Sequence, residues 1–213
     1  MNKIINKALL CLATLSLTGC ALINKVGDKE VSYTEWHQKA EELKVEQEKQ
    51  FFTKVVYDMD GTMLDESTDE TYSAKVHMEL VYSEETKELE VDKEKSTNFD
   101  DPEDTRTDEQ KLGLGLMVAF MCGTPADKME EFKIEKDDDE DKSDGTVKYF
   151  INNLQKHETL KVEINQTIDK EGNKVDWKNV MCYNEFGLLS SATMKADRTD
   201  VTISASYTYA PKA

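Results

Sequence analysis

The chain has 213 residues, of which 44 are acidic and 27 are basic, so its formal net charge is −17. A surface this acidic repels phosphate groups, which argues against binding to nucleic acid and against flat docking on an anionic membrane. The length left after a short N-terminal leader is enough for one domain with a hydrophobic core.

The N-terminus carries a targeting pattern. Lys3 and Lys7 precede an apolar run over residues 8–17, which is too short to span a bilayer and is typical of a signal peptide. The run ends in Leu17-Thr18-Gly19-Cys20, and together these residues resemble the signal of bacterial lipoproteins. The alternatives are an ordinary secretory signal with a chance cysteine and a buried N-terminal helix.

The lipoprotein resemblance implies that residues 1–19 are removed as a signal peptide and that Cys20 becomes a lipidated N-terminus. The protein would then be anchored to a bacterial cell membrane or envelope and would face outside the cytoplasm. Two acyl chains, of the palmitate kind, make such an anchor stable, since each buried methylene contributes about 0.8 kcal/mol.

After the anchor, we expect residues 20–31 to be a lipidated tether and residues 32–213 to form a single α+β domain. Ser32 and Glu35 have the spacing of a capping box, in which the hydroxyl accepts from the Glu35 amide and the carboxylate reaches back. A stripe at helical spacing follows, formed by Trp36, Ala40, Leu43 and Gln47. The pattern predicts a helix with one apolar edge.

From Phe51 the hydrophobic period changes to two, which is typical of antiparallel strands with one face in water. Turn signals at 83–86, 169–173 and 183–187 separate the alternating segments. The alternating residues are Val55, Tyr57 and Met59; Val76, Met78 and Leu80; Leu89 and Val91; Leu160, Val162, Ile164 and Ile168; Val175, Trp177 and Val180; and Val201, Ile203, Ala205, Tyr207 and Tyr209.

The middle of the chain combines acidic and apolar segments. Residues 100–108 predict a solvated loop, and Thr107 and Gln110 form a second capping box ahead of the apolar run 112–121. Ten residues cannot cross a membrane, so the run predicts a buried helix or strand, thinned on one face by two glycines. Thr124 and Pro125 predict the start of a further helix.

The acidic run 137–145 invites a calcium interpretation. The helix-loop-helix calcium spacing fails, because a start at Glu140 places Ile151 where a glutamate is required. We therefore expect a solvated turn, with a loose cation-collecting loop as the alternative, and we expect no metal site or cofactor. Cys122 and Cys182 either pair in a disulfide or form two separate buried thiols.

One motif carries catalytic chemistry in another family. The sequence from Val55 to Asp65 contains Asp58-Met-Asp60-Gly-Thr, which resembles the first motif of haloacid-dehalogenase-like phosphatases. The resemblance implies Asp58 as nucleophile, Asp60 as acid and base, and bound magnesium. The chain offers no matching second strand and lacks the continuous apolar runs of a parallel sheet. We therefore interpret 58–61 as a turn and expect no enzyme activity.

The order of elements from residue 31 to 210 resembles the lipoprotein-carrier fold. This resemblance implies a curved antiparallel sheet, or half-barrel, that packs on one to three helices and leaves an apolar cleft for a lipid or another apolar or amphiphilic ligand. The residues expected to line the cleft are Trp36, Val76, Met78, Leu80, Leu114, Met117, Phe120, Val162, Ile164, Val201 and Ile203. The alternative is a surface interaction module with a filled core and exposed aromatic residues, for which Tyr183, Tyr207 and Tyr209 are the candidates.

Overall fold

The computed structural model describes residues 27–134, 141–170 and 173–212, without the side chains of 120–122, 141–143, 170 and 173. The predicted signal peptide and the predicted lipid site Cys20 therefore lie outside the described residues. The helical elements are α2 (Tyr33–Glu48), α3 (Asp108–Gly123) and the 3₁₀ turns η1 (Ala126–Lys128) and η2 (Lys156–Glu158). The strands are β1 (Asp28–Val31), β2 (Gln50–Asp65), β3 (Glu70–Ser73), β4 (Val76–Tyr82), β5 (Leu89–Val91), β6 (Asp141–Asn152), β7 (Leu160–Lys170), β8 (Asn173–Tyr183), β9 (Leu189–Ala196) and β10 (Thr199–Pro211).

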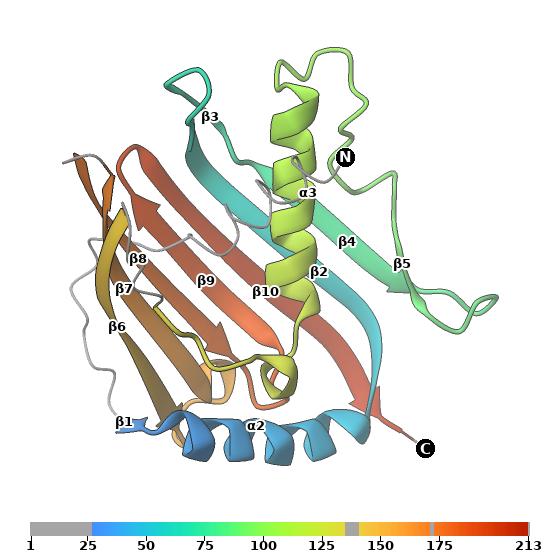
Figure 1. The fold of residues 1–213 in the computed structure, drawn as a ribbon. Coiled ribbons are helices and arrows are strands. Elements are labelled where there is room, and N and C mark those ends of the chain that lie inside the picture. Colours follow the sequence, from blue (N-terminus) through green and yellow to red (C-terminus); the bar gives the residue numbers. More distant parts are fainter. Residues whose placement is uncertain (1–26, 135–140, 171–172, 213) are drawn as a thin grey trace.

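The strands form one open antiparallel sheet (Figure 1). Its order is β1-β6-β7-β8-β9-β10-β2-β4-β5, with β3 paired to β2. The run from β6 to β10 is a meander of neighbours in sequence, of which the alternation in the C-terminal region predicted β7, β8 and β10 but not β6 or β9. β10 then pairs along almost its whole length with β2, so the two ends of the described chain share one sheet. The expectation of an α+β protein with an antiparallel sheet is confirmed.

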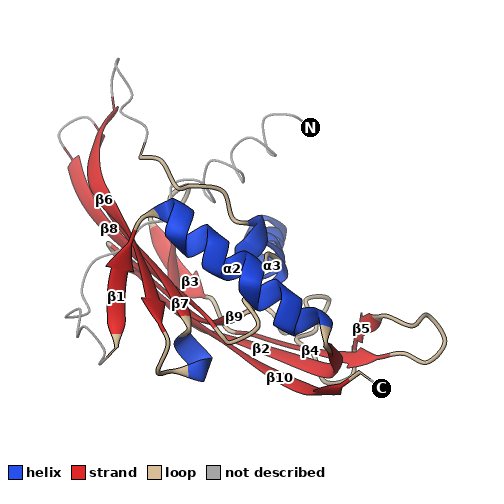
Figure 2. Cartoon of the chain, turned by 90° about the horizontal axis from the view of Figure 1, so that it is seen from below, coloured by secondary structure: helices blue, strands red, loops and turns tan. Residues whose placement is uncertain are grey.

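Both long helices lie on the same face of the sheet (Figure 2). We call this the inner face. α2 begins where the sequence predicts, because the Ser32 hydroxyl accepts a hydrogen bond from the Glu35 amide at 3.2 Å. The Glu35 carboxylate binds Lys29 instead, at 2.7 Å, so only half of the capping box forms. The predicted stripe of Trp36, Ala40 and Leu43 is buried.

The second capping box forms in full and starts α3. The Gln110 amide donates to the Thr107 hydroxyl at 3.2 Å, and the Thr107 amide donates to the Gln110 side chain at 3.0 Å. The apolar run 112–121 is therefore helical. The helix expected after Pro125 is only the 3₁₀ turn η1, which docks on α2 through an ion pair between Lys44 and Asp127 at 3.2 Å.

Three further segments differ from the sequence-based expectation. Residues 137–140 of the acidic run lie outside the described residues. Residues 141–145, which were expected to continue the turn, form the start of β6, where the register places Lys142 opposite Asp169 of β7. Residues 58–61 are not a turn but the interior of β2. Ordered structure also begins within the expected tether, since residues 28–31 form β1 and pair with β6.

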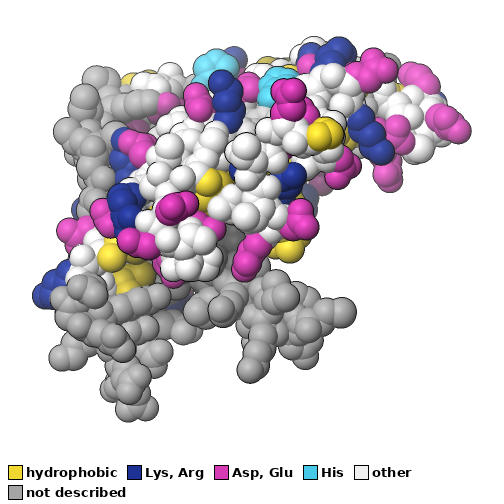
Figure 3. All heavy atoms as spheres, turned by 90° about the horizontal axis from the view of Figure 1, so that it is seen from above, with side chains coloured by type: hydrophobic (Ala, Val, Ile, Leu, Met, Phe, Trp, Pro, Cys, Tyr) yellow, Lys and Arg dark blue, Asp and Glu magenta, His cyan; other side chains and the backbone are white. Residues whose placement is uncertain are grey.

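Charged side chains cover the solvated surface. On the face seen in Figure 3, acidic side chains are scattered among lysines and arginines, and apolar side chains show only in small areas. Within the described part of the chain, neither long helix combines the length and hydropathy needed to cross a membrane.

Candidate functional site

One row of side chains crosses the inner face of the sheet. The register places its members directly opposite one another on eight neighbouring strands, from β1 to β4. The row consists of Val31, Tyr149, Val162, Met181, Ala192, Ile203, Met59 and Val76. Val76, Val162 and Ile203, which the alternation of the sequence predicted to share one face of the sheet, all belong to this row.

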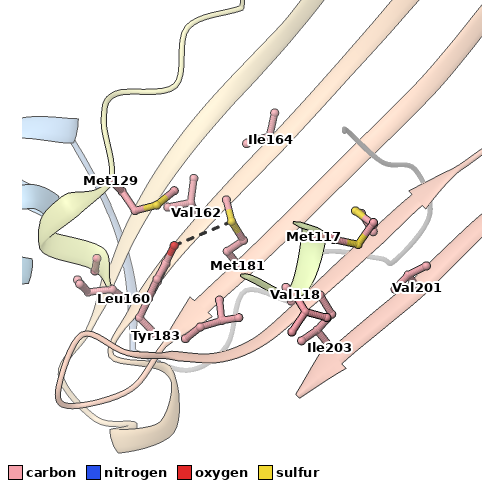
Figure 4. Close-up of a cluster of buried hydrophobic side chains, with 14 of the residues drawn as sticks. Met117, Val118, Met129, Leu160, Val162, Ile164, Met181, Tyr183, Val201 and Ile203 are labelled. Carbon is pink, nitrogen blue, oxygen red and sulfur yellow. Dashed lines mark hydrogen bonds between the residues drawn. The ribbon is translucent and has the colours of Figure 1, made fainter. Parts of the chain in front are cut away.

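α3 covers the centre of this face. Figure 4 shows Met117 and Val118 beside Val201 and Ile203 of β10. Together with Leu114 they belong to the same hydrophobic core as Trp36 of α2. The side chain of Phe120, which was expected to join them, lies outside the described residues, and so does that of Cys122, so its pairing with Cys182 stays a prediction.

Most of the predicted ligand-lining residues are sealed from solvent. Trp36, Leu114, Val162 and Val201 have no exposed surface at all. The remaining members of this group are also buried, namely Val76, Met117, Ile164 and Ile203. A ligand could reach these side chains only if α2 or α3 moved away from the sheet.

Two of the residues predicted to line the ligand cleft, Met78 and Leu80, lie on β4, next to the edge strand β5 of the sheet. Met78 and Leu80 are partly exposed, and the register places Tyr57 opposite Met78 and Val91 opposite Leu80. Val91 is 48% exposed. We call Tyr57, Met78, Leu80 and Val91 the inner-face strip. It is an apolar surface on the sheet that solvent and ligands can reach.

Polar contacts fix the N-terminal end of α3 beside the sheet. The Gln110 side-chain amide donates to the Asp65 carboxylate at 2.8 Å. Arg106 makes a bidentate pair with Asp104, with both N–H···O distances 2.8 Å, and donates to the Lys75 carbonyl at 3.0 Å. The helix is thus anchored at its first turn by charged and amide groups, and the rest of its length is apolar.

α3 is apolar on two faces. One carries the buried Leu114, Met117 and Val118, whereas Leu112 and Leu116 lie one helical turn apart on the opposite side and are 53% and 38% exposed. A Cβ added at Gly113 or Gly115 would meet no atom of the described residues within 4 Å. Within the described part of the chain, the glycines therefore do not serve close packing and leave open space beside the exposed leucines.

Aromatic rings join α2 to the sheet at the other end of the core. The Trp36 ring lies 5.6 Å from that of Tyr149 and 5.8 Å from that of Tyr183. The Trp36 indole N–H is buried and has no hydrogen-bond partner among the described residues. Burial raises the pKa of Tyr183, whose hydroxyl points to the Met181 sulfur in Figure 4. Tyr183 is therefore core and not part of an exposed aromatic patch, while Tyr209 is exposed.

The phosphatase-like motif lies on the opposite, outer face. Asp58 and Asp60 stand two residues apart inside β2, paired with Ser204 and Thr202 of β10. Asp58 contacts the His77 ring at 2.6 Å, and both side chains are well exposed. Every strand pair in the described sheet is antiparallel, and the motif does not end a strand.

Two surface hollows lie elsewhere on the protein. The larger, of about 770 Å³, lies between β3, the loop 97–107 and the start of α3, and the smaller, of about 350 Å³, lies across β6, β7 and β8. Their walls include Lys75, Asn98 and Thr105 in the first and Asn165 and Asp176 in the second. Neither hollow is lined by the inner-face strip or by the sealed core residues.

Among the described residues, no group of His, Cys, Asp and Glu side chains is arranged to hold a metal ion. Comparisons with protein-family models, with curated proteins and with solved structures gave no match.

Sequence reasoning did not single out Tyr57 and Val91 as part of an accessible surface. Both residues follow the same two-residue period as neighbouring buried residues of the inner face. This period was the signal in the sequence that could have placed them on that face. The exposure of Tyr57 and Val91 depends on how much of the sheet α3 covers. The covered area is set by the tertiary structure and not by the local sequence.

Proposed function

We propose that this protein is a non-catalytic lipoprotein, anchored through Cys20 and facing outside the cytoplasm, that binds an apolar or amphiphilic ligand on the inner-face strip. The observation that carries the proposal is the strip itself, an apolar surface that continues the inner face beyond the helices. Removal of apolar surface from water contributes about 25 cal/mol per Å² and requires no catalytic group. For the fold, we further propose that the antiparallel sheet is a curved half-barrel like that of the lipoprotein carriers.

The position of α3 supports this proposal. Gln110 in its first turn and Arg106 just before it hold its start, and its apolar body rests on the sheet through Leu114 and Met117. Its other end leads into η1, where the Ala126 amide donates to the Gly187 carbonyl at 2.8 Å and Asp127 pairs with Lys44. Because α3 is held at both ends, the strip is the part of the inner face that a ligand can reach without movement of the helix.

Native mass spectrometry on soluble protein that starts after Cys20 tests the proposal. A stoichiometric extra mass that extracts into organic solvent supports ligand binding. Leu80→Ser should remove that mass, whereas the neighbouring Val81→Ser on the opposite face of β4 is the matched control and should not. A bare chain mass that stays unchanged after addition of candidate lipids contradicts the proposal.

The second candidate is a protein-interaction module with a filled core. The specific observation in its favour is that Trp36, Leu114, Val162 and Val201 are sealed, while Leu112 and Leu116 expose an apolar stripe on α3. A photoreactive residue at 116 should then crosslink to a defined protein in cells. The same residue at Val45, which is 53% exposed on α2 and thus more accessible than Leu116, is the control and should not crosslink.

A further inference from the structure

Leu154 projects from the loop between β6 and β7 and is the most exposed of the large apolar side chains in the described part of the chain, at 72%. The backbone beneath it is fixed. The Leu154 amide donates to the Asn152 side chain at 2.9 Å, and the amide of Glu185 donates to the Lys156 carbonyl at 2.7 Å. The loop therefore holds a leucine in water on a rigid support.

The first described residue of the chain lies against this leucine. A Cβ built on Gly27 would stand 2.8 Å from Leu154 Cδ1 and 2.9 Å from the Asn152 side-chain oxygen, and the φ angle of Gly27 is +97°. Only glycine combines this backbone conformation with so close an approach. Asn152 also donates to the Asp28 carboxylate at 2.8 Å, which ties the start of β1 to the same loop.

Gly27 follows the proposed lipid site closely. Six residues lie between it and Cys20, and the seven Cα–Cα steps that join the two positions reach at most about 25 Å when fully extended. If Cys20 carries the anchor, the loop that touches Gly27 is held close to the bilayer surface, whatever path the intervening residues take.

The charge of the loop differs from that of the chain as a whole. The chain has a formal net charge of −17, but residues 153–159 carry one lysine, Lys156, and one acid, Glu158, and are formally neutral. Lys156 and His157 are exposed beside Leu154, whereas Glu158 is half-buried. A leucine flanked by a lysine suits the headgroup region, because the leucine enters the apolar boundary and the lysine extends its ammonium group toward phosphate.

We propose that Leu154 and Lys156 form a membrane-contact tip that rests on the bilayer in which Cys20 is anchored. The proposal rests on the lipidation of Cys20 in the proposed function. It gives the domain an orientation, with the β6–β7 loop toward the lipid and β5, at the other end of the sheet order, away from it.

The test uses the full-length lipidated protein in vesicles of phosphatidylethanolamine and phosphatidylglycerol that contain lipids brominated near the headgroup. An environment-sensitive fluorophore is placed on Leu154→Cys or, as the matched control outside the inner-face strip, on Val81→Cys of β4, both in a Cys122→Ser background in which Cys182 is buried. Because interfacial apolar groups lie about 5–10 Å into the bilayer boundary, we expect at least about twofold stronger quenching at 154 than at 81. Lys156→Glu should reduce the quenching at 154.

The possible failures are distinguishable by intact mass. A chain in which Cys20 carries no lipid overturns the proposed anchor and, with it, the membrane-contact tip. A lipidated, vesicle-bound chain whose label at 154 is quenched no more than the label at 81 overturns the tip alone and leaves the anchor in place.

Discussion

Gln110 and Asp65 join α3 to the end of β2 through a hydrogen bond of 2.8 Å from the side-chain amide to the carboxylate. The same Gln110 side chain accepts from the Thr107 amide and completes the capping box. One residue thus starts the helix and attaches it to the sheet.

Gln110→Ala should loosen α3. The substitution removes one hydrogen bond to a charged acceptor and one capping bond, which together contribute about 1–3 kcal/mol. Hydrogen exchange of the α3 amides should become faster, while that of the β7 amides should change little. Gln38→Ala, at an exposed position of α2, is the control. Equal exchange rates in α3 of both variants would contradict the proposed attachment.

Asp104 should make the stability of the loop before α3 depend on pH. Hydrogen bonds from the Arg106 side chain lower the Asp104 pKa from 3.8 to about 2. Because the folded pKa lies below the unfolded one, this contribution is fully present above pH 3.8 and is lost as the pH falls toward 2. An NMR titration of the carboxyl carbon should show the lowered pKa, and Arg106→Gln should return it toward 3.8.

The parts of the fold that the sequence predicted are those set by local chemistry. Ser32 and Thr107 mark helix starts because a cap and its amide lie within one turn. The inner-face row was predicted because side chains alternate along any strand. β9 was missed, since its inward positions include the small Ala192, which gives a weak hydrophobic signal.

The parts that the sequence did not predict depend on distant partners. The sequence of residues 141–145 predicts a loop. In the structure these residues pair with β7, whose residues opposite Lys142 and Asp141 carry the opposite charge. The difference between buried Val76 and accessible Met78, two residues apart, depends on the coverage of the sheet by α3. No pattern within β4 contains that information.

Trp36 should be a large contributor to stability. Trp36→Ala removes a fully buried indole and should cost about 3–5 kcal/mol. Trp36→Phe should cost at least about 2 kcal/mol less, because it keeps a ring and removes a buried N–H that has no partner among the described residues. Urea unfolding followed by circular dichroism measures both. Equal losses for the two variants would show that the N–H has a partner in solution.

Lys161, on the outer face of the sheet near β1, should be essential to the stability of the fold. Its ammonium group contacts both Asp28 and Glu163, and all three side chains are at most 10% exposed. Lys161→Met leaves two buried carboxylates without their cation and should cost about 3–5 kcal/mol. Lys148→Met is the matched control, because Lys148 of β6 and Glu30 of β1 form an exposed pair at 2.9 Å, worth at most about 1 kcal/mol. Similar unfolding free energies for the two variants would rule out the structural role given to Lys161.

Gly61 and Gly113 should respond to alanine in opposite directions. In β2, Gly61 has a φ of +144°, and a Cβ there would stand 2.0 Å from the Asp200 carbonyl oxygen. Gly61→Ala should therefore cost about 2–4 kcal/mol, through backbone strain and displacement of β10. A Cβ at Gly113 meets nothing within 4 Å, so Gly113→Ala should stabilise α3 by about 0.5–1 kcal/mol. Thermal unfolding of the two variants measures the difference, and a destabilised Gly113→Ala would mean that the open space beside α3 is filled in solution.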